Sequence, residues 1–211
     1  MDELLQRLLA LDTTTLSDAG KELRVMDAGL RPVALSRKLV GRAVTVAAGG
    51  GLIRVVDALG RAGAGDVLVI DGEGGTRALA GELFASEAHR KGLAGIVIDG
   101  PCRDTSELRQ IPLPVYARGC VPSAAAAGTP SGDEPGRVGP VSCGGVEVAP
   151  GDILVGDDDG IVVGTADELE AVLEAAEALQ ATERSILAAI RAGTSLFERL
   201  ERSEGGLRFK D

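Results

Sequence analysis

The sequence predicts one α/β domain with parallel strand pairing, followed by a long C-terminal helix. Three observations carry this prediction. Short apolar runs typical of buried strands alternate with helical patterns over residues 40–117. Short strand patterns separated by turns follow, and residues 166–192 hold one continuous helical pattern. The 211 residues suffice for one full core, so we expect a single domain over residues 1–211 with its core at about 13–165.

In the N-terminal half, the hydrophobic periods of helices and of strands alternate along the chain. In the first helix, Leu4, Leu5, Leu8 and Leu9 share one face. Buried strands are expected where apolar runs begin after glycine and end at Asp-Gly. The expected elements are, in chain order, helices at 2–10 and 13–19, a strand at 40–47, a helix through 53–59, a strand at 67–70, a helix at 81–91, a strand at 95–98, a short helix to about 108 and a strand at 115–117.

The C-terminal half changes character. Pro, Gly, Ser and Ala dominate residues 121–140, which predicts a loop or hinge and not a domain boundary. Strand patterns then occupy 146–148, 153–155 and 161–163, and their turns predict a β-meander that closes the domain.

Composition restricts the possible partners. A 45% apolar and 26% charged content is ordinary for a globular protein and excludes a disordered chain. No apolar run approaches the ~20 residues of a membrane span, and the charged N-terminus is unlike a signal peptide. The net charge of -10, the absence of a basic patch and an aromatic content of 2% argue against nucleic acid. We therefore expect small metabolites or proteins as partners, with neither nucleic acid nor membrane among them.

Cysteine and histidine restrict the chemistry. Cys102, Cys120 and Cys143 are widely spaced without a C-x-x-C pair, which disfavours a disulfide framework or zinc knuckle and fits the reducing cytoplasm. Cys102 is expected to be a small buried residue, although the neighbouring Arg103 would favour its thiolate. His89 is the only histidine, and no G-x-S-x-G elbow is present. Any metal would be held by carboxylates and water, which favours Mg²⁺ or Mn²⁺.

Two predicted strands end in the same Val-Ile-Asp-Gly sequence, at 69–72 and 97–100. Ligands bind beyond the carboxyl ends of such strands. The first strand leads to Gly81–Phe84 at a helix N-terminus, which favours an anion. The second leads to Arg103, whose guanidinium can bind a carboxylate, and to Asp104, whose carboxylate can bind a divalent cation. These groups suit a small α-keto acid; the alternative is a surface ion pair beside a simple helix cap.

Other polar or glycine-rich segments are expected to be structural. The glycines at 49–51 and 72–75 match neither phosphate-binding pattern and are turn residues. The aspartates at 157–159 could bind a metal but lie between two strands, which favours a solvated turn. His89 is expected near the end of an exposed helix.

Glu183 interrupts the apolar stripe of the last helix. It falls four residues after Leu179 and four before Leu187, and a buried carboxylate is costly unless it is paired. Either it reaches the edge of the stripe or meets an arginine, or the face packs on another subunit and delivers Glu183 to that subunit's site. The sequence leaves both open.

An ordered set of motifs resembles the 4-hydroxy-4-methyl-2-oxoglutarate aldolases, class II pyruvate aldolases that also decarboxylate oxaloacetate and share a fold with the regulator of ribonuclease activity A. The resemblance extends from about Thr13 to Ala192. The motifs are Asp71-Gly72, Gly81-Glu82-Leu83, Gly95 to Gly100, Arg103-Asp104, Pro114-Val115, Gly144-Gly145-Val146, Pro150-Gly151-Asp152 and Gly156 to Gly160.

The resemblance implies a swivelling β/β/α fold assembled as homotrimers or dimers of trimers. It implies that Arg103 binds the pyruvate carboxylate and that Asp104 anchors Mg²⁺ or Mn²⁺. Residues Gly81, Glu82, Leu83 and Phe84 would supply backbone amides. The Glu82 carboxylate and Glu183 of a neighbouring subunit, whose helix at 166–192 packs across the interface, would hold a water.

The implied reaction cleaves the C3–C4 bond of a 4-hydroxy-2-oxo acid, and the cation stabilises the enolate charge. Oxaloacetate decarboxylation gives the same pyruvate enolate. A protein that only binds and inhibits a ribonuclease is the rival function, and a lyase acting on another small 2-oxo acid is the third. The loop at 49–52 lacks the polar residues frequent in the family, and the tail after Gly193 matches loosely.

Overall fold

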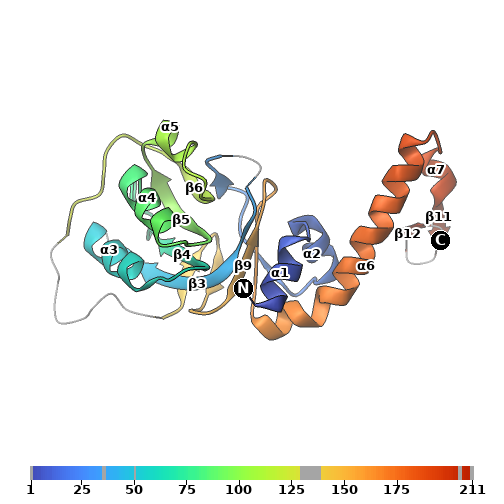
Figure 1. Ribbon diagram of the computed structural model, residues 1–211, viewed down its shortest axis with the longest axis horizontal. Coiled ribbons are helices and arrows are strands. Elements are labelled where there is room, and N and C mark those ends of the chain that lie inside the picture. Colours follow the sequence, from blue (N-terminus) through green and yellow to red (C-terminus); the bar gives the residue numbers. More distant parts are fainter. Residues whose placement is uncertain (1, 35–36, 50, 129–138, 204–205, 210–211) are drawn as a thin grey trace.

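The computed structural model describes residues 2–34, 37–49, 51–128, 139–203 and 206–209. Its centre is an eight-stranded mixed sheet with the strand order β1-β10-β9-β3-β4-β5-β6-β2 (Figure 1). These strands are β1 (Arg24–Val25), β2 (Arg31–Pro32), β3 (Leu39–Ala47), β4 (Asp66–Asp71), β5 (Gly95–Cys102), β6 (Val115–Cys120), β9 (Ile153–Gly156) and β10 (Ile161–Gly164). The helices are α1 (Glu3–Leu9), α2 (Thr13–Ala19), α3 (Leu52–Arg61), α4 (Glu82–Arg90), α5 (Thr105–Leu108), α6 (Ala166–Arg191) and α7 (Leu196–Arg199).

The predicted parallel pairing is confirmed for β3, β4, β5 and β6, which are neighbours in this order. Strand β5 continues past the expected end at Ile98 to Cys102, with a shift of register against β6 between Ile98 and Pro101. The extension carries β5 up to Arg103. Each predicted helix of this half is present, although Leu9 of α1 is 37% exposed while Leu5 and Leu8 are buried.

Three apolar clusters hold the layers together. One lies between the parallel strands and helices α3, α4 and α5, with Leu68 and Ile96 at its centre. The second lies on the opposite face and includes Val97 and Cys143. The third joins α1, α2 and the first half of α6 to the antiparallel strands, through residues such as Leu8 and Leu169. Alternate residues of β5 therefore serve both faces, as expected of a strand covered on both sides.

The predicted β-meander is wrong in one respect. Strands β9 and β10 form an antiparallel hairpin in the main sheet, but β8 (Val146–Val148) pairs with β7 (Val141–Cys143), a strand that the sequence analysis missed. Gly144 and Gly145 adopt φ values of +61° and +75° between them, the conformation that a tight hairpin turn requires. The β7–β8 hairpin consequently forms a separate two-stranded sheet.

The carboxylates of Asp71 and Asp99 hold this hairpin on the main sheet. They lie opposite each other, Asp71 at the carboxyl end of β4 and Asp99 within β5. Asp99 accepts a hydrogen bond from the Gly144 N–H at 2.7 Å, and Asp71 accepts one from the Ser142 N–H at 3.3 Å. The repeated Val-Ile-Asp-Gly sequence thus has a structural role here.

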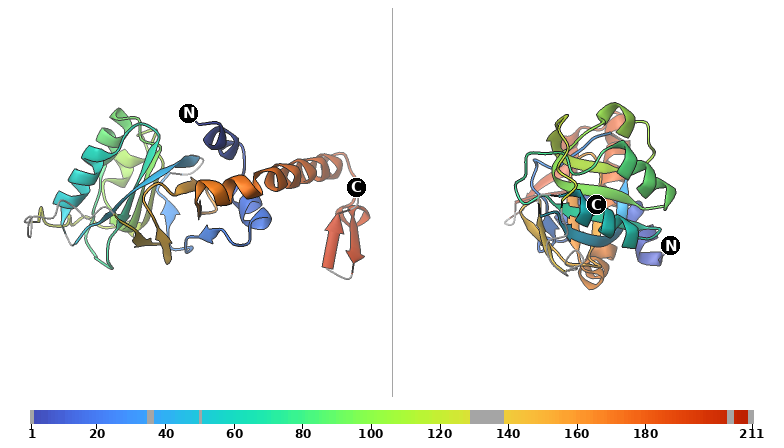
Figure 2. Two further views of the ribbon diagram at one scale, coloured as in Figure 1. Left: turned by 90° about the horizontal axis from the view of Figure 1, so that it is seen from below. Right: turned by 90° about the vertical axis from the view of Figure 1, so that its left-hand side faces the viewer.

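The long C-terminal helix is confirmed as α6, and a capping box between Thr165 and Glu168 starts it. Its first half packs on the body, whereas the second half projects away from it towards α7 and the hairpin of β11 (Leu200–Ser203) and β12 (Gly206–Phe209) (Figures 1 and 2). The buried Gln180 joins α6 to the end of α1, because its side-chain amide donates to the Ala10 carbonyl at 2.8 Å.

The remaining predictions concern loops and membrane spans. The loop expected at 121–140 contains no helix or strand in its described flanks, 121–128 and 139–140, and its centre lies outside the described residues. Within the described part of the chain, no helix combines the length and the apolar character needed to cross a bilayer.

Candidate functional site

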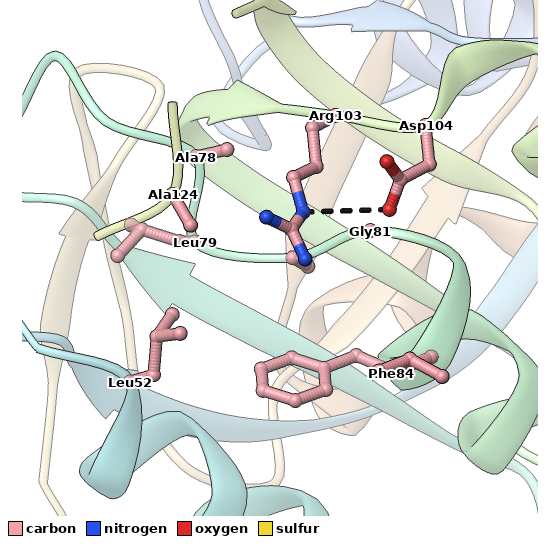
Figure 3. Close-up of a pocket in the computed structure, with 10 residues that line it drawn as sticks. Leu52, Ala78, Leu79, Gly81, Phe84, Arg103, Asp104 and Ala124 are labelled. Carbon is pink, nitrogen blue, oxygen red and sulfur yellow. Dashed lines mark ion pairs between the residues drawn. The ribbon is translucent and has the colours of Figure 1, made fainter. Parts of the chain in front are cut away.

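A small cavity lies where β5 ends and α4 begins (Figure 3). It encloses about 130 Å³, room for a molecule of a few heavy atoms. Arg103 points into it, with Asp104 beside it and Leu52 and Phe84 across from it. The lining residues are Leu52, Ala78, Leu79, Ala80, Gly81, Leu83, Phe84, Arg103, Asp104 and Ala124.

Asp104 connects the two chain segments that form the polar side of the cavity. Its Oδ2 atom accepts a hydrogen bond from the Glu82 N–H at 3.1 Å and lies 3.4 Å from Arg103 Nε. Its backbone is left-handed, with φ 57° and ψ 44°, a conformation that costs free energy for a residue other than glycine. Strain of this kind concentrates at functional sites, because the surrounding structure must maintain it.

Gly81 allows this close approach. Its backbone is extended, so glycine is not needed for its dihedral angles. A Cβ atom at this position would clash with Oδ2 of Asp104 and come within 2.9 Å of Arg103 Cγ. The absent side chain therefore brings the start of α4 against the Arg103-Asp104 pair.

The N-terminus of α4 adds hydrogen-bond donors to the cavity. The Ala85 N–H donates to the Gly81 carbonyl at 3.0 Å, but the N–H groups of Leu83 and Phe84 have no acceptor among the described residues. Free N–H groups and the helix dipole favour an anion at this end of a helix. Together with the Arg103 guanidinium, whose side chain is 39% exposed, they form a site for a small carboxylate.

The donor set fits a hydrated divalent cation. Among the residues that the structure describes, no three His, Cys, Asp or Glu side chains are grouped to enclose a metal. Asp104 contributes the one carboxylate in the cavity lining, and its Oδ1 atom accepts no hydrogen bond from the described residues. Mg²⁺ commonly retains several waters and is held by one or two carboxylates, so a single free carboxylate oxygen suits it.

The structure brings together five of the seven expected site residues: Gly81, Leu83, Phe84, Arg103 and Asp104. Glu82 contributes its N–H to Asp104, but its exposed side chain does not line the cavity. Glu183 is half-buried on α6, a helix that lies at the far side of the molecule from α4 (Figures 1 and 2). Within one chain, Glu183 is therefore remote from the cavity.

Sequence reasoning missed the apolar walls of the cavity. Residues 78–80 are apolar in the sequence, but their position depends on long-range pairing. The Arg103 N–H donates to the Ala80 carbonyl at 3.1 Å, and the Ala78 N–H donates to the Ser123 carbonyl at 2.9 Å. The same contact brings Ala124 to the cavity wall, and no sequence pattern predicts this position. Leu52 could have been found as the first residue of a helix beside a glycine-rich turn.

The aspartates at 157–159 lie apart from the cavity, and Asp157 is a structural anchor. It accepts hydrogen bonds from the Thr13 hydroxyl and N–H at 2.5 and 2.8 Å and pairs with Lys38 at 3.2 Å. Burial opposes ionisation of Asp157, but the bonds from Thr13 and the charge of Lys38 outweigh it and lower its pKa. The turn expected here is confirmed, although Asp157 is more buried than a solvated turn implies. His89 is exposed, as expected.

Fold and site together define a class: α/β proteins with a small cavity at the carboxyl end of a parallel strand, lined by an arginine, an aspartate and the N-terminus of a helix. Comparison with known families makes the assignment specific. The family described as "RraA-like: Aldolase/RraA" matches residues 13–163, and the chain belongs to this family.

Relatives extend the match beyond that core. A 4-hydroxy-4-methyl-2-oxoglutarate aldolase of Thermus thermophilus is 37% identical over 155 residues, covering 72% of this chain and 90% of its own. A Halalkalibacterium halodurans protein, named provisionally for the same activity, is 36% identical over 185 residues, covering 87% and 86%.

Solved structures support the fold. A Pseudomonas syringae protein without an assigned function superposes with a TM-score of 0.80 at 28% identity, covering 92% of this chain and 95% of its own. The RNA-processing inhibitor RraA of Thermus thermophilus superposes with a TM-score of 0.64 at 34% identity, covering 72% and 91%.

Proposed function

We propose that this protein is a divalent-metal-dependent class II pyruvate aldolase. It would cleave 4-hydroxy-2-oxo acids of the 4-hydroxy-4-methyl-2-oxoglutarate type to pyruvate and would also decarboxylate oxaloacetate. The observation that carries the proposal is the meeting of Arg103, the strained Asp104 and the free N–H groups of α4 in one small cavity. The names of relatives at 36–37% identity agree with a carbon–carbon lyase.

Substrate binding follows from the positive groups of the cavity. The Arg103 guanidinium would pair with the carboxylate of the 2-oxo acid, and the N–H groups of Leu83 and Phe84 would donate to the same oxygens. The apolar walls at Leu52, Leu79 and Phe84 exclude water from one side, which strengthens these interactions.

Asp104 would hold Mg²⁺ or Mn²⁺ through its free Oδ1 atom. When bound, the cation supplies positive charge beside the keto oxygen, where negative charge develops on C3–C4 cleavage or decarboxylation. The N–H of Glu82 and the Nε of Arg103 fix the orientation of the Asp104 carboxylate. Asp104 would thereby hold the cation beside the carboxylate site.

The proton acceptor requires a second chain. Glu82 and Glu183 of a neighbouring subunit would hold a water that takes the proton of the 4-hydroxyl oxygen. The protein would then be a homotrimer or a dimer of trimers with α6 across the interface. Exposed apolar side chains on the projecting part support a packing role, with Leu187 49%, Ile190 36% and Phe197 83% exposed.

A metal-dependence assay tests this function. Purified protein, stripped with a chelator, is supplied with Mg²⁺ or Mn²⁺ and assayed for pyruvate release from oxaloacetate and from several 4-hydroxy-2-oxo acids. Turnover should require the metal and be abolished by Asp104→Ala, whereas Asp57→Ala, on the exposed face of α3, should retain it. Equal turnover of the Asp104 variant would place the metal elsewhere.

The rival function is inhibition of a ribonuclease by protein binding. The similarity to the RNA-processing inhibitor RraA and the net charge of -10 favour it. A binding protein has no need for a strained aspartate beside an arginine in a cavity. Inhibition of an endoribonuclease by this protein, retained in the Asp104→Ala variant and without lyase turnover on any acid of the panel, would establish the rival. Turnover of only a different 2-oxo acid would show that the substrate differs from the one proposed, while the proposed roles of the site residues remain.

A further inference from the structure

Two of the three cysteines lie opposite each other on neighbouring strands. Cys102 ends β5, Cys120 ends β6, and the register of the two strands pairs them. Neighbouring strands are about 4.8 Å apart, within the roughly 4.4–6.8 Å that separates the Cα atoms of disulfides. Both residues line one surface cavity of about 310 Å³, separate from the Arg103 cavity. The two thiols therefore lie on the same side of the sheet, at the same cavity.

The two thiols differ in their access to solvent. Cys120 is exposed, and Cys102 is completely buried behind it. The third cysteine, Cys143, is also buried, but in the cluster on the opposite face of the sheet. A thiol reagent in solution consequently meets Cys120 first, and Cys102 is the thiol placed to react next.

We propose that Cys102 and Cys120 form a reversible disulfide that responds to the thiol redox state and alters the Arg103 cavity. With glutathione disulfide as oxidant, the Cys120 thiolate attacks one sulfur of glutathione disulfide and releases one glutathione thiolate. The Cys102 thiolate then attacks Cys120 Sγ and releases the second. Two cysteine thiols are oxidised, one glutathione disulfide is reduced to two thiols, and the cysteine protons pass through solvent to the glutathione leaving groups.

The disulfide would act on the site through the chain that it closes. Its loop contains Arg103 and Asp104, and Arg103 directly follows Cys102. The Arg103 N–H donates to the Ala80 carbonyl at 3.1 Å, and the Val121 N–H donates to the Cys102 carbonyl at 2.9 Å. A covalent bond between the two strand ends would therefore change the position of Arg103 against the cavity wall. This effect on the cavity rests on the proposed function, whereas the disulfide itself does not.

Peptide mapping of the full-length protein tests the proposal. The native protein is treated with glutathione disulfide, trapped by alkylation at several times and digested without reduction. The expected product is a Cys102–Cys120 linked peptide that dithiothreitol reverses. Cys143→Ala should give the same product, Cys120→Ser should give none, and Cys102→Ala should stop at the glutathione adduct of Cys120.

Several outcomes would overturn the proposal. One is a Cys120–glutathione adduct that persists in the wild type, and another is a Cys120–Cys120 link between chains. Oxaloacetate turnover should fall at least fivefold on linkage and return on reduction; unchanged turnover in the linked protein would refute the effect on the cavity. Linkage in a protein without any turnover supports the disulfide and contradicts the proposed function. Normal turnover without linkage supports the proposed function and contradicts the disulfide.

Discussion

At the scale of single residues, the site depends on one missing side chain and one strained backbone. Gly81 leaves the space into which the Asp104 carboxylate fits, and Asp104 reaches it from a left-handed conformation. The two features are coupled. Without either of them, the start of α4 and the start of α5 could not approach each other as closely. Substitutions here should affect the site more than the fold.

Gly81→Ala should disrupt the site. The added methyl group forces the Asp104 carboxylate or the start of α4 to move, at a cost of about 1–3 kcal/mol for overpacking. Calorimetric titration with pyruvate and Mg²⁺ should show lost affinity, and urea unfolding should show the destabilisation. Gly60→Ala is the control: it lies in α3 with nothing within 4 Å of the added Cβ and should stabilise by roughly 0.5–1 kcal/mol. Wild-type pyruvate affinity in Gly81→Ala would contradict the account.

Arg103→Lys should raise KM for the 2-oxo acid about tenfold or more, because lysine retains the charge but loses the two parallel N–H donors of the guanidinium. Steady-state kinetics with oxaloacetate would measure the change. Arg90→Lys, at an exposed position on α4, should leave KM unaltered. An unchanged KM at position 103 would remove the carboxylate-binding role.

At the scale of elements, the sequence predicted the helices and strands that show a hydrophobic period. Strands β3 to β6 and helices α3, α4 and α6 have runs long enough to show a period, and their positions were anticipated. The two-residue strands β1 and β2 are too short to show one. Strand β7 lies beside a turn whose glycines were read only as a motif. The position of the β7–β8 hairpin on the main sheet depends on Asp71 and Asp99, more than forty residues away for each bond, which no local pattern reports.

The same limit applies to the site. Arg103, Asp104 and Gly81 could be selected because parallel strands end at one edge of a sheet. The apolar walls could not, since residues 78–80 and Ala124 meet through backbone bonds between distant loops.

The turn after β9 should make stability depend on pH through Asp157. Its pKa in the folded protein is lowered, so its contribution is complete above the unfolded value of about 3.9 and is lost as the pH falls through the lower folded value. Asp157→Asn should therefore cost about 1–3 kcal/mol at pH 7, and the difference from wild type should shrink below about pH 4. Urea unfolding across pH 7 to 3 measures this. Asp57→Asn should show no such trend; an equal difference at all pH values would assign the loss to packing.

At the scale of the whole molecule, α4, which begins at the cavity, and α6, which carries Glu183, lie on opposite sides of one chain (Figures 1 and 2). The body encloses the cavity, while α6 carries Glu183 and exposed apolar residues such as Leu187 outwards. Beyond Gln180, the stripe on α6 contains the buried Ile186 but leaves Leu187 and Ile190 exposed.

Mixed assemblies test whether Glu183 serves another subunit's cavity. Glu183→Gln should preserve assembly and lower turnover by roughly 10²–10⁴, as expected for loss of an acid–base group. Asp104→Ala and Glu183→Gln chains, each impaired alone, should regain activity when co-assembled, because random mixing pairs both intact residues at about one site in four. Native mass spectrometry would verify the mixed oligomers. Their failure to regain activity would leave Glu183 a structural residue.

The place of β3 in the sheet has a consequence for synthesis of the protein. Its partners are β4, which follows directly, and β9, whose Val155 pairs with Val40. While the ribosome makes the intervening segment, one edge of β3 has no strand to cover it, and an open edge invites pairing with other chains. The nascent chain can cover this edge of β3 only after residue 156 has emerged, so the slow, sequence-distant closure of β9 onto β3 should set the folding rate.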